Sequence, residues 1–81
     1  MTCVNEEGAK KIARDNKIDL ENSRFTESNS GIEYNVVNVN YGADKSPKGK
    51  ILSYTVWVWL SNDEDRKQVQ LEDFRKQYRV I

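Results

Sequence analysis

The sequence predicts an α+β fold: an N-terminal helix packed on a three- or four-stranded antiparallel sheet, with a short helix near the C-terminal end. Two runs rich in β-branched and aromatic residues, 32–41 and 51–60, predict the long strands at the centre of the sheet. A helical apolar stripe in residues 5–15 predicts the first helix. Because the chain has only 81 residues, we expect a single domain over 1–81 with a modest core.

The first helix is expected over residues 5–15. Asn5 can cap its N-terminus, and Glu6 and Glu7 place negative charge in the first turn, where the helix dipole favours it. Its apolar stripe consists of Val4, Ala9, Ile12 and Ala13. We expect Asp15–Asn16 to end the helix, because asparagine tolerates the left-handed conformation common at helix C-termini.

Residues 24–27 predict a short edge strand, and the polar segment 28–31 that follows is typical of a turn. In the strand over 32–41 the apolar alternation changes phase near Val36–Val37, which indicates a β-bulge or a bend. The polar segment 42–49 predicts a long loop that joins this strand to 51–60 in an antiparallel hairpin. We expect this loop to be the most mobile internal segment.

The strand 51–60 has large apolar side chains on both faces, so both faces need cover. One face carries Ile51, Ser53, Thr55, Trp57 and Trp59, and the other carries Leu52, Tyr54, Val56, Val58 and Leu60. We expect Val56 and at least one of the two tryptophans to be buried, with the tryptophan pair under the first helix. If the pair is exposed instead, it forms a stacking platform for bases, sugar rings or a partner's side chains.

The C-terminal part of the chain predicts a short strand over 67–70 and then a short helix. Leu71, Phe74 and Tyr78 have the i, i+3, i+7 spacing of one helix face. Either this apolar stripe or a partner would cover the second face of strand 51–60.

The side chains that catalysis needs are scarce. The sequence contains no histidine, and no adjacent base activates Cys3, its single cysteine. The acidic turn Asp63–Asp65 lacks the glycine and the distal glutamate of a calcium loop. We therefore expect a protein that is not an enzyme and that uses no metal ion or cofactor.

Charge and composition limit the partners. Thirteen Lys and Arg residues balance thirteen Asp and Glu residues, so net charge provides no general attraction to DNA or to an anionic membrane. A single cysteine excludes an internal disulfide, and no segment is apolar enough for a signal peptide or a membrane span. We expect a small soluble cytoplasmic protein.

The function that we expect is non-enzymatic binding of a protein partner or of a second copy of the chain. The expected contact residues are Tyr54 and Val58 on the second face of strand 51–60, Trp57 and Trp59, and the loop residues Lys45 and Lys48. A homodimer would form through the second face or through an unpaired strand edge. The alternative is a nucleic-acid-binding module that uses Lys45, Lys48 and Lys50 together with exposed aromatic residues.

The segment Glu6–Ala13, followed by an antiparallel meander, resembles the cystatin-like and PepSY-like plan of a helix across a sheet. The segment Val69–Tyr78 is similar to small accessory proteins of phages and prophages. The similarity covers one helix pattern, a strand order and this C-terminal segment, and the chain is assigned to neither group. It implies a binding protein, such as an inhibitor or accessory protein of a phage or mobile element.

Overall fold

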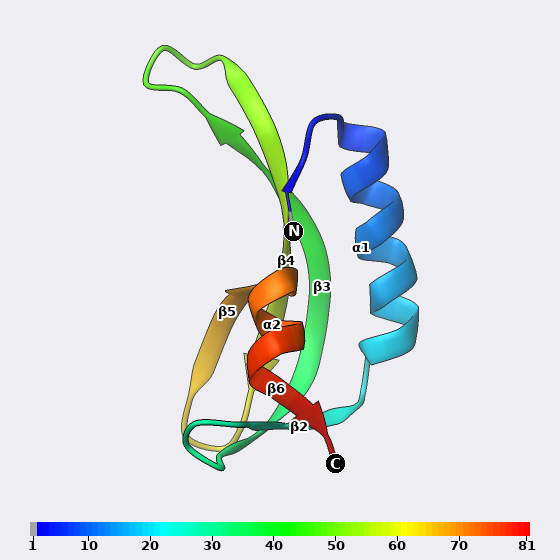
Figure 1. Cartoon of the computed structure of the whole chain (residues 1–81), viewed down its shortest axis with the longest axis vertical. Helices are drawn as coiled ribbons and strands as arrows, with labels where there is room; N and C mark the ends of the chain where they lie inside the picture. Colours follow the sequence, from blue (N-terminus) through cyan, green and yellow to red (C-terminus); the bar gives the residue numbers. More distant parts are fainter. Residues whose placement is uncertain (1) are drawn as a thin grey trace.

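In residues 2–81, which the computed structural model describes, six antiparallel strands and two helices build the fold (Figure 1). In chain order the elements are β1 (Thr2–Cys3), α1 (Glu6–Leu20), β2 (Arg24–Glu27), β3 (Glu33–Lys45), β4 (Ile51–Ser61), β5 (Arg66–Gln70), α2 (Leu71–Gln77) and β6 (Tyr78–Val80). The prediction of an α+β fold with an N-terminal helix, an antiparallel sheet and a short C-terminal helix is confirmed. The sheet has more strands than expected because β1 and β6, at the two ends of the chain, also join it.

The long hairpin of β3 and β4 is the centre of the sheet, as the sequence predicts. The strand order is β1-β4-β3-β2-β6, and β5 pairs with the part of the β4 edge that β1 leaves free. The predicted strand at 24–27 is present as β2. It lies between β3 and β6 instead of at an edge, because the C-terminal strand pairs with its outer side.

A β-bulge in β3 keeps one face of this strand in the core. The pairing register with β4 shifts between Val36 and Asn38, so Val37 is an extra residue in the ladder. As a result, Tyr34 and Val36 before the bulge and Val39 after it are all buried. The phase change in the sequence therefore marks a real irregularity of the strand.

The helix α1 begins at the Asn5 cap, whose side chain accepts a hydrogen bond from the Gly8 N–H at 2.7 Å. A Cβ atom on residue 8 would lie 2.9 Å from the Asn5 Oδ1, so glycine leaves room for the cap. The helix continues to Leu20, beyond the expected end at Asp15–Asn16, because the Leu20 side chain is buried in the core. The asparagine that adopts the left-handed conformation is Asn22, just after the helix, with φ 65°, and not Asn16.

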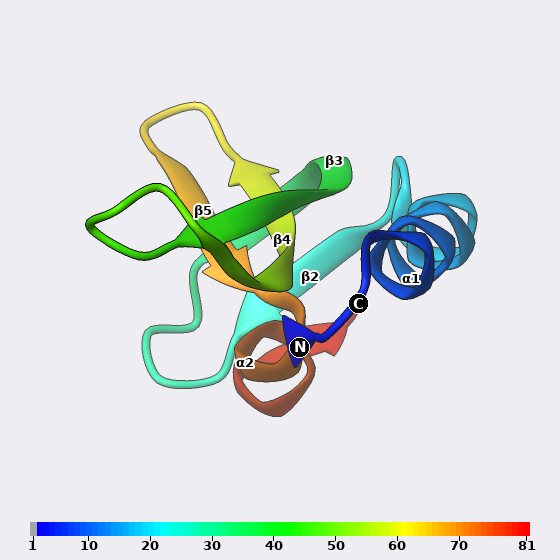
Figure 2. The same ribbon diagram turned by 90° about the horizontal axis from the view of Figure 1, so that it is seen from above.

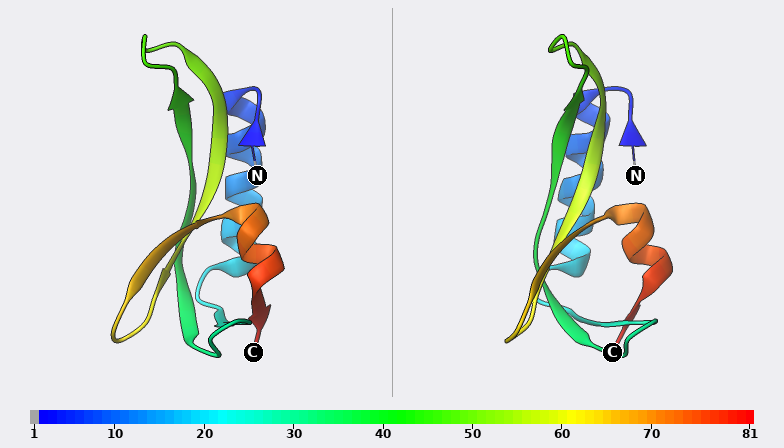
Figure 3. Two further views of the ribbon diagram at one scale, coloured as in Figure 1. Left: turned by 60° about the vertical axis from the view of Figure 1, so that its left-hand side comes forward. Right: turned by 90° about the vertical axis from the view of Figure 1, so that its left-hand side faces the viewer.

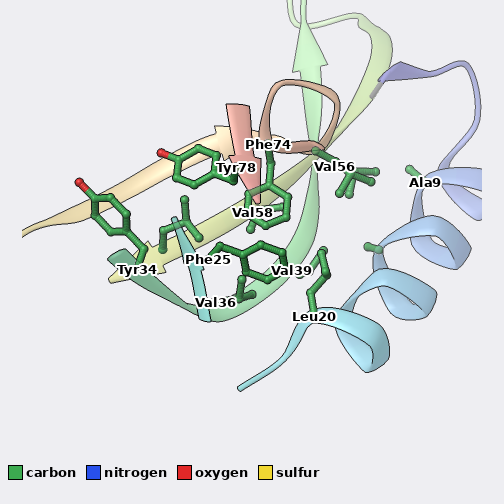
Figure 4. Packing of buried hydrophobic residues seen from close by; sticks show 13 residues of the cluster. Ala9, Leu20, Phe25, Tyr34, Val36, Val39, Val56, Val58, Phe74 and Tyr78 are labelled. Carbon is green, nitrogen blue, oxygen red and sulfur yellow. The ribbon is translucent and has the colours of Figure 1, made fainter. Parts of the chain in front are cut away.

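Both helices lie on the same side of the hairpin, as Figure 3 shows in its left panel. Seen from above, α1 runs beside β3 and α2 lies under the curved sheet (Figure 2). Side chains from both helices meet those of the sheet in one apolar cluster (Figure 4). The cluster consists of Ala9, Ala13, Leu20, Phe25, Tyr34, Val36, Val39, Val56, Val58, Leu60, Leu71, Phe74 and Tyr78.

The Phe74 ring occupies the centre of this core. It meets the Phe25 ring edge-on, with 4.7 Å between the centroids, and it stacks against Tyr78 at 5.2 Å. Burial of Leu71 and Phe74 confirms the predicted C-terminal helix and its apolar face. Tyr78 is buried as expected, but it belongs to β6.

The two tryptophans do not belong to this core. Val56, Val58 and Leu60 form the core face of β4 and are at most 1% exposed. Trp57 and Trp59 alternate with them and therefore point to the other side, where neither helix lies. The burial of Val56 is confirmed, whereas the expectation of a tryptophan buried under the first helix is wrong. On the core face, aromatic rings of β2, α2 and β6 pack against the smaller side chains of β4 instead.

Three elements that are distant in the sequence meet at the Glu27 carboxylate, which ties β2 to β5 and β6. Its Oε2 accepts hydrogen bonds from Lys67 Nζ at 3.0 Å and from the Tyr78 hydroxyl at 2.8 Å. Its Oε1 accepts one from the Ser30 hydroxyl at 2.6 Å. These hydrogen bonds lower the pKa of Glu27 from 4.5 to about 2, and the bond from Ser30 has the largest effect. Burial and the bond to Glu27 raise the pKa of Tyr78 to about 12.

We expect Phe74→Ala to remove about 3–5 kcal/mol from the free energy of unfolding, because it leaves a cavity where two other rings make contact. Such a loss is a large share of the stability of a domain of this size. Urea unfolding followed by circular dichroism measures it. The control is Ile18→Ala, since Ile18 is 75% exposed and its loss should change stability by less than about 0.5 kcal/mol. Similar losses for the two variants would contradict the assignment of the core.

We expect acid to weaken the fold through Glu27. Because its pKa in the folded chain is about 2 and its usual value is 4.5, its contribution is complete above pH 4.5 and is lost as the pH falls toward 2. In urea unfolding, Glu27→Gln should therefore lower stability at neutral pH and have little effect near pH 2. Glu33→Gln, which neutralises an exposed carboxylate on the next strand, is the control. A Glu27→Gln effect that stays constant with pH would disprove this role.

Candidate binding face

The side of the sheet that faces away from both helices carries the two tryptophans. We call it the open face, and it is built from two cross-strand rungs over β3, β4 and β5. The rungs are Asn40–Trp57–Gln70 and Asn38–Trp59–Gln68. Directly paired residues of an antiparallel sheet place their side chains on the same face. Each indole therefore lies between an asparagine and a glutamine.

Both indoles of the open face are half-buried, so part of each ring contacts solvent. A hollow of about 430 Å³ lies beside Trp59. Its walls include Val37, which the bulge leaves 54% exposed, and Arg66 and Gln68 of β5. The open face thus combines exposed indole surface, amide groups and a shallow apolar hollow.

One end of the same face is a closed polar cluster. The Asp44 carboxylate accepts hydrogen bonds from the Thr55 hydroxyl at 2.5 Å and from the Ser53 hydroxyl at 3.1 Å. Thr55 is only 4% exposed, and these contacts satisfy its hydroxyl. Among the described residues, no three His, Cys, Asp or Glu side chains gather in a group that could hold a metal ion.

A groove of about 220 Å³ separates α1 from β3 next to the open face. On the helix side it is lined by Lys10, Arg14 and Lys17, which follow the i, i+4, i+7 spacing of one helix face. On the sheet side it is lined by Asn38 and Asn40. These two asparagines belong to both the groove and the open face, so the two surfaces are continuous.

The cations of this groove have no acidic partner in the part of the chain that the structure describes. Ion pairs within residues 2–81 join Glu27 to Lys67 and Glu72 to Lys76. Acidic residues instead gather at the opposite end of the sheet, where Asp63, Glu64 and Asp65 line a separate hollow with Arg66. The charge around the open face is therefore uneven, although the net charge of the chain is zero.

The structure separates the expected partner-contact residues of strand 51–60 into two groups. Val58 is fully buried and cannot meet a partner in the folded chain, so its expected contact role is wrong. Tyr54 lies on the same core side and is half-buried against Tyr41, with 6.2 Å between the ring centroids. Trp57 and Trp59 lie on the open face, where a ligand can reach them.

The expected contact residues Lys45 and Lys48, with Lys50, lie at the tip of the hairpin and are exposed. The connection is shorter than the expected loop 42–49, because residues 42–45 pair with β4. A turn closes it, in which the Ser46 carbonyl accepts a hydrogen bond from the Gly49 N–H at 2.9 Å. The tip lies about 20 Å along the strand from Trp57, so the loop lysines and the tryptophans are not brought together.

Sequence reasoning missed the residues that surround the tryptophans. Lys10, Arg14 and Lys17 already share one helix face in the sequence, and the pairs Asn38/Asn40 and Gln68/Gln70 alternate as strand residues do. These two patterns could have indicated a basic stripe and a polar strand face. Only the placement of α1 beside β3 shows that they adjoin.

Comparisons of the chain with protein-family models, with curated protein sequences and with solved structures found no match. Within residues 2–81, neither helix has the length and apolar composition that crossing a membrane requires.

We expect the intrinsic fluorescence of the chain to report a solvent-accessible face, because Trp57 and Trp59 are its only tryptophans. Acrylamide should quench a large part of the emission of the native protein. Single variants, Trp57→Phe and Trp59→Phe, would assign the accessibility to each ring. Emission that resists quenching until the chain unfolds would place the tryptophans in the core.

Proposed function

We propose that the protein is a non-enzymatic binding module and that its open face receives the ligand. The observation that carries this proposal is the pair of half-buried tryptophans within the two Asn–Trp–Gln rungs. Indole rings offer flat apolar area and lose little conformational entropy on binding, and the amides beside them both donate and accept hydrogen bonds. Such a surface suits a ligand with planar rings and polar edges.

The titratable groups support binding in preference to catalysis. Glu27, Lys67 and Tyr78 have displaced pKa values, and the hydrogen bond from Ser30, the burial of Tyr78 and the contacts of the three residues with one another account for these shifts. The pKa of Tyr41 is raised by its hydrogen bond to Glu6, which joins β3 to α1. These groups hold elements of the fold together, and the sequence has no histidine to act as a general base.

Besides a ligand with planar rings and polar edges, a protein partner is the second candidate, in line with the sequence-based expectation. The hollow between Val37 and Trp59 favours it, because an apolar side chain of a partner can anchor in such a place. A second copy of the chain could use the same hollow. Sedimentation at increasing protein concentration measures that self-association directly.

Affinity capture from cells that express the chain tests the role of the open face. We expect the wild-type chain to retain a ligand that the double variant Trp57→Ala/Trp59→Ala loses. The matched control is Ile51→Ala/Leu52→Ala, which removes exposed apolar side chains near the hairpin tip and should retain the ligand. Mass spectrometry and nuclease treatment identify the ligand as protein or nucleic acid.

Circular dichroism of each bait shows whether it is folded. If the double tryptophan variant unfolds, Asn40→Ala/Gln70→Ala tests the same face, since it removes one amide pair and leaves both indoles. Equal retention of every ligand by the wild type, the open-face variant and the control would refute the proposal.

A further inference from the structure

We infer that the ligand of the open face is a single-stranded nucleic acid whose backbone follows the groove between α1 and β3. This inference rests on the proposed function and names the ligand class of that same face. Three features carry it: the unpaired cations of the groove, the asparagines shared by the groove and the open face, and the two indoles beyond them.

The groove provides positive charge in one line. Lys10, Arg14 and Lys17 occupy successive turns of one helix face, and all three are exposed. The other residues that line the groove are the neutral Ala13, Asn38, Val39, Asn40 and Tyr41, so its lining has a net positive charge. A polymer with regularly spaced phosphates fits this arrangement, and contacts between phosphates and cations supply most of the affinity in nonspecific nucleic-acid binding.

The open face provides what unpaired bases need. Trp57 and Trp59 are two residues apart on one strand face, hence about 7 Å apart, and each offers an indole on which a base can stack. Asparagine and glutamine amides in the same rungs can form hydrogen bonds with base edges. A strand of a duplex keeps its bases stacked and paired, so this face suits an unpaired strand.

The position of the shared asparagines connects the two features. Asn38 and Asn40 line the groove and are the direct cross-strand partners of Trp59 and Trp57. Adjacent strands lie about 5 Å apart, so a base attached to a backbone in the groove can reach the indole across one strand. The turn at the far end of the sheet, lined by Asp63, Glu64, Asp65 and Arg66, has a net negative charge and disfavours a polyanion there.

Fluorescence anisotropy with labelled oligo-dT and oligo-U of about 12 nucleotides tests the inference and separates DNA from RNA. We expect binding at low ionic strength, with log K falling against log [salt] with a slope of about −2 for three phosphate contacts. The variant Lys10→Gln/Arg14→Gln/Lys17→Gln should bring this slope close to zero. The variant Trp57→Ala/Trp59→Ala should weaken binding at least about tenfold and leave the slope unchanged.

The matched control is Lys45→Gln/Lys48→Gln/Lys50→Gln, which removes the same number of positive charges at the hairpin tip and should keep the wild-type slope. An equal loss of affinity in the groove variant and in the hairpin-tip variant would show general electrostatic attraction and overturn the inference. So would the absence of binding to both polymers at low salt. In that case, a captured ligand that still depends on the tryptophans would leave the proposed function intact and identify a protein partner.

Discussion

One extra residue in β3 brings the apolar side chains of both long strands to the same side of the hairpin. Because Val37 interrupts the pairing with β4, the buried set continues from Val36 to Val39 on one face of the strand. Without the bulge, the asparagines at 38 and 40 would point toward the helices and Val39 would point to solvent. The contribution of β3 to the apolar cluster and to the open face follows from this shift in register.

The other elements cover the apolar side of the hairpin. The helix α2 places Phe74 between rings of β2 and β6, and α1 covers the remaining part with small side chains, chiefly Ala9 and Ala13. The Glu27 carboxylate then holds β2, β5 and β6 together through Lys67 and Tyr78. A core built in this way has no need of the indoles, which leaves two large aromatic side chains on the outside.

The sequence predicts those features that depend on local periodicity. The hairpin, the bulge and the C-terminal helix each leave a pattern over a few neighbouring residues, and each is present. The choice of core face in β4 has no such local signal, because Val58 and Trp59 are both apolar and differ only in the face they occupy. Which face of β4 the helices cover depends on tertiary packing, and here the rings of Phe25, Phe74 and Tyr78 cover the valine face.

The parts of the candidate site were also visible in the sequence, but their proximity was not. Lysines near a long loop suggest a basic patch at 45–50, yet the extended hairpin carries them away from the indoles. The cations that do adjoin the indoles lie on a helix far earlier in the sequence, at Lys10, Arg14 and Lys17. Residues of four separate segments form the surface, so only the packing of α1 beside β3 reveals it.

The bulge keeps the apolar side chains of β3 on the core side of β4, opposite the tryptophans, and cross-strand contacts measured by nuclear magnetic resonance are the decisive test of this arrangement. We expect backbone nuclear Overhauser effects that pair Asn38 with Trp59 and Asn40 with Trp57, and no effects between the indole protons and the ring protons of Phe74. A backbone effect that pairs Val37 with Trp59 would show that the bulge is absent, and an indole contact with the Phe74 ring would show the tryptophan face in the core. Either result would disprove this arrangement.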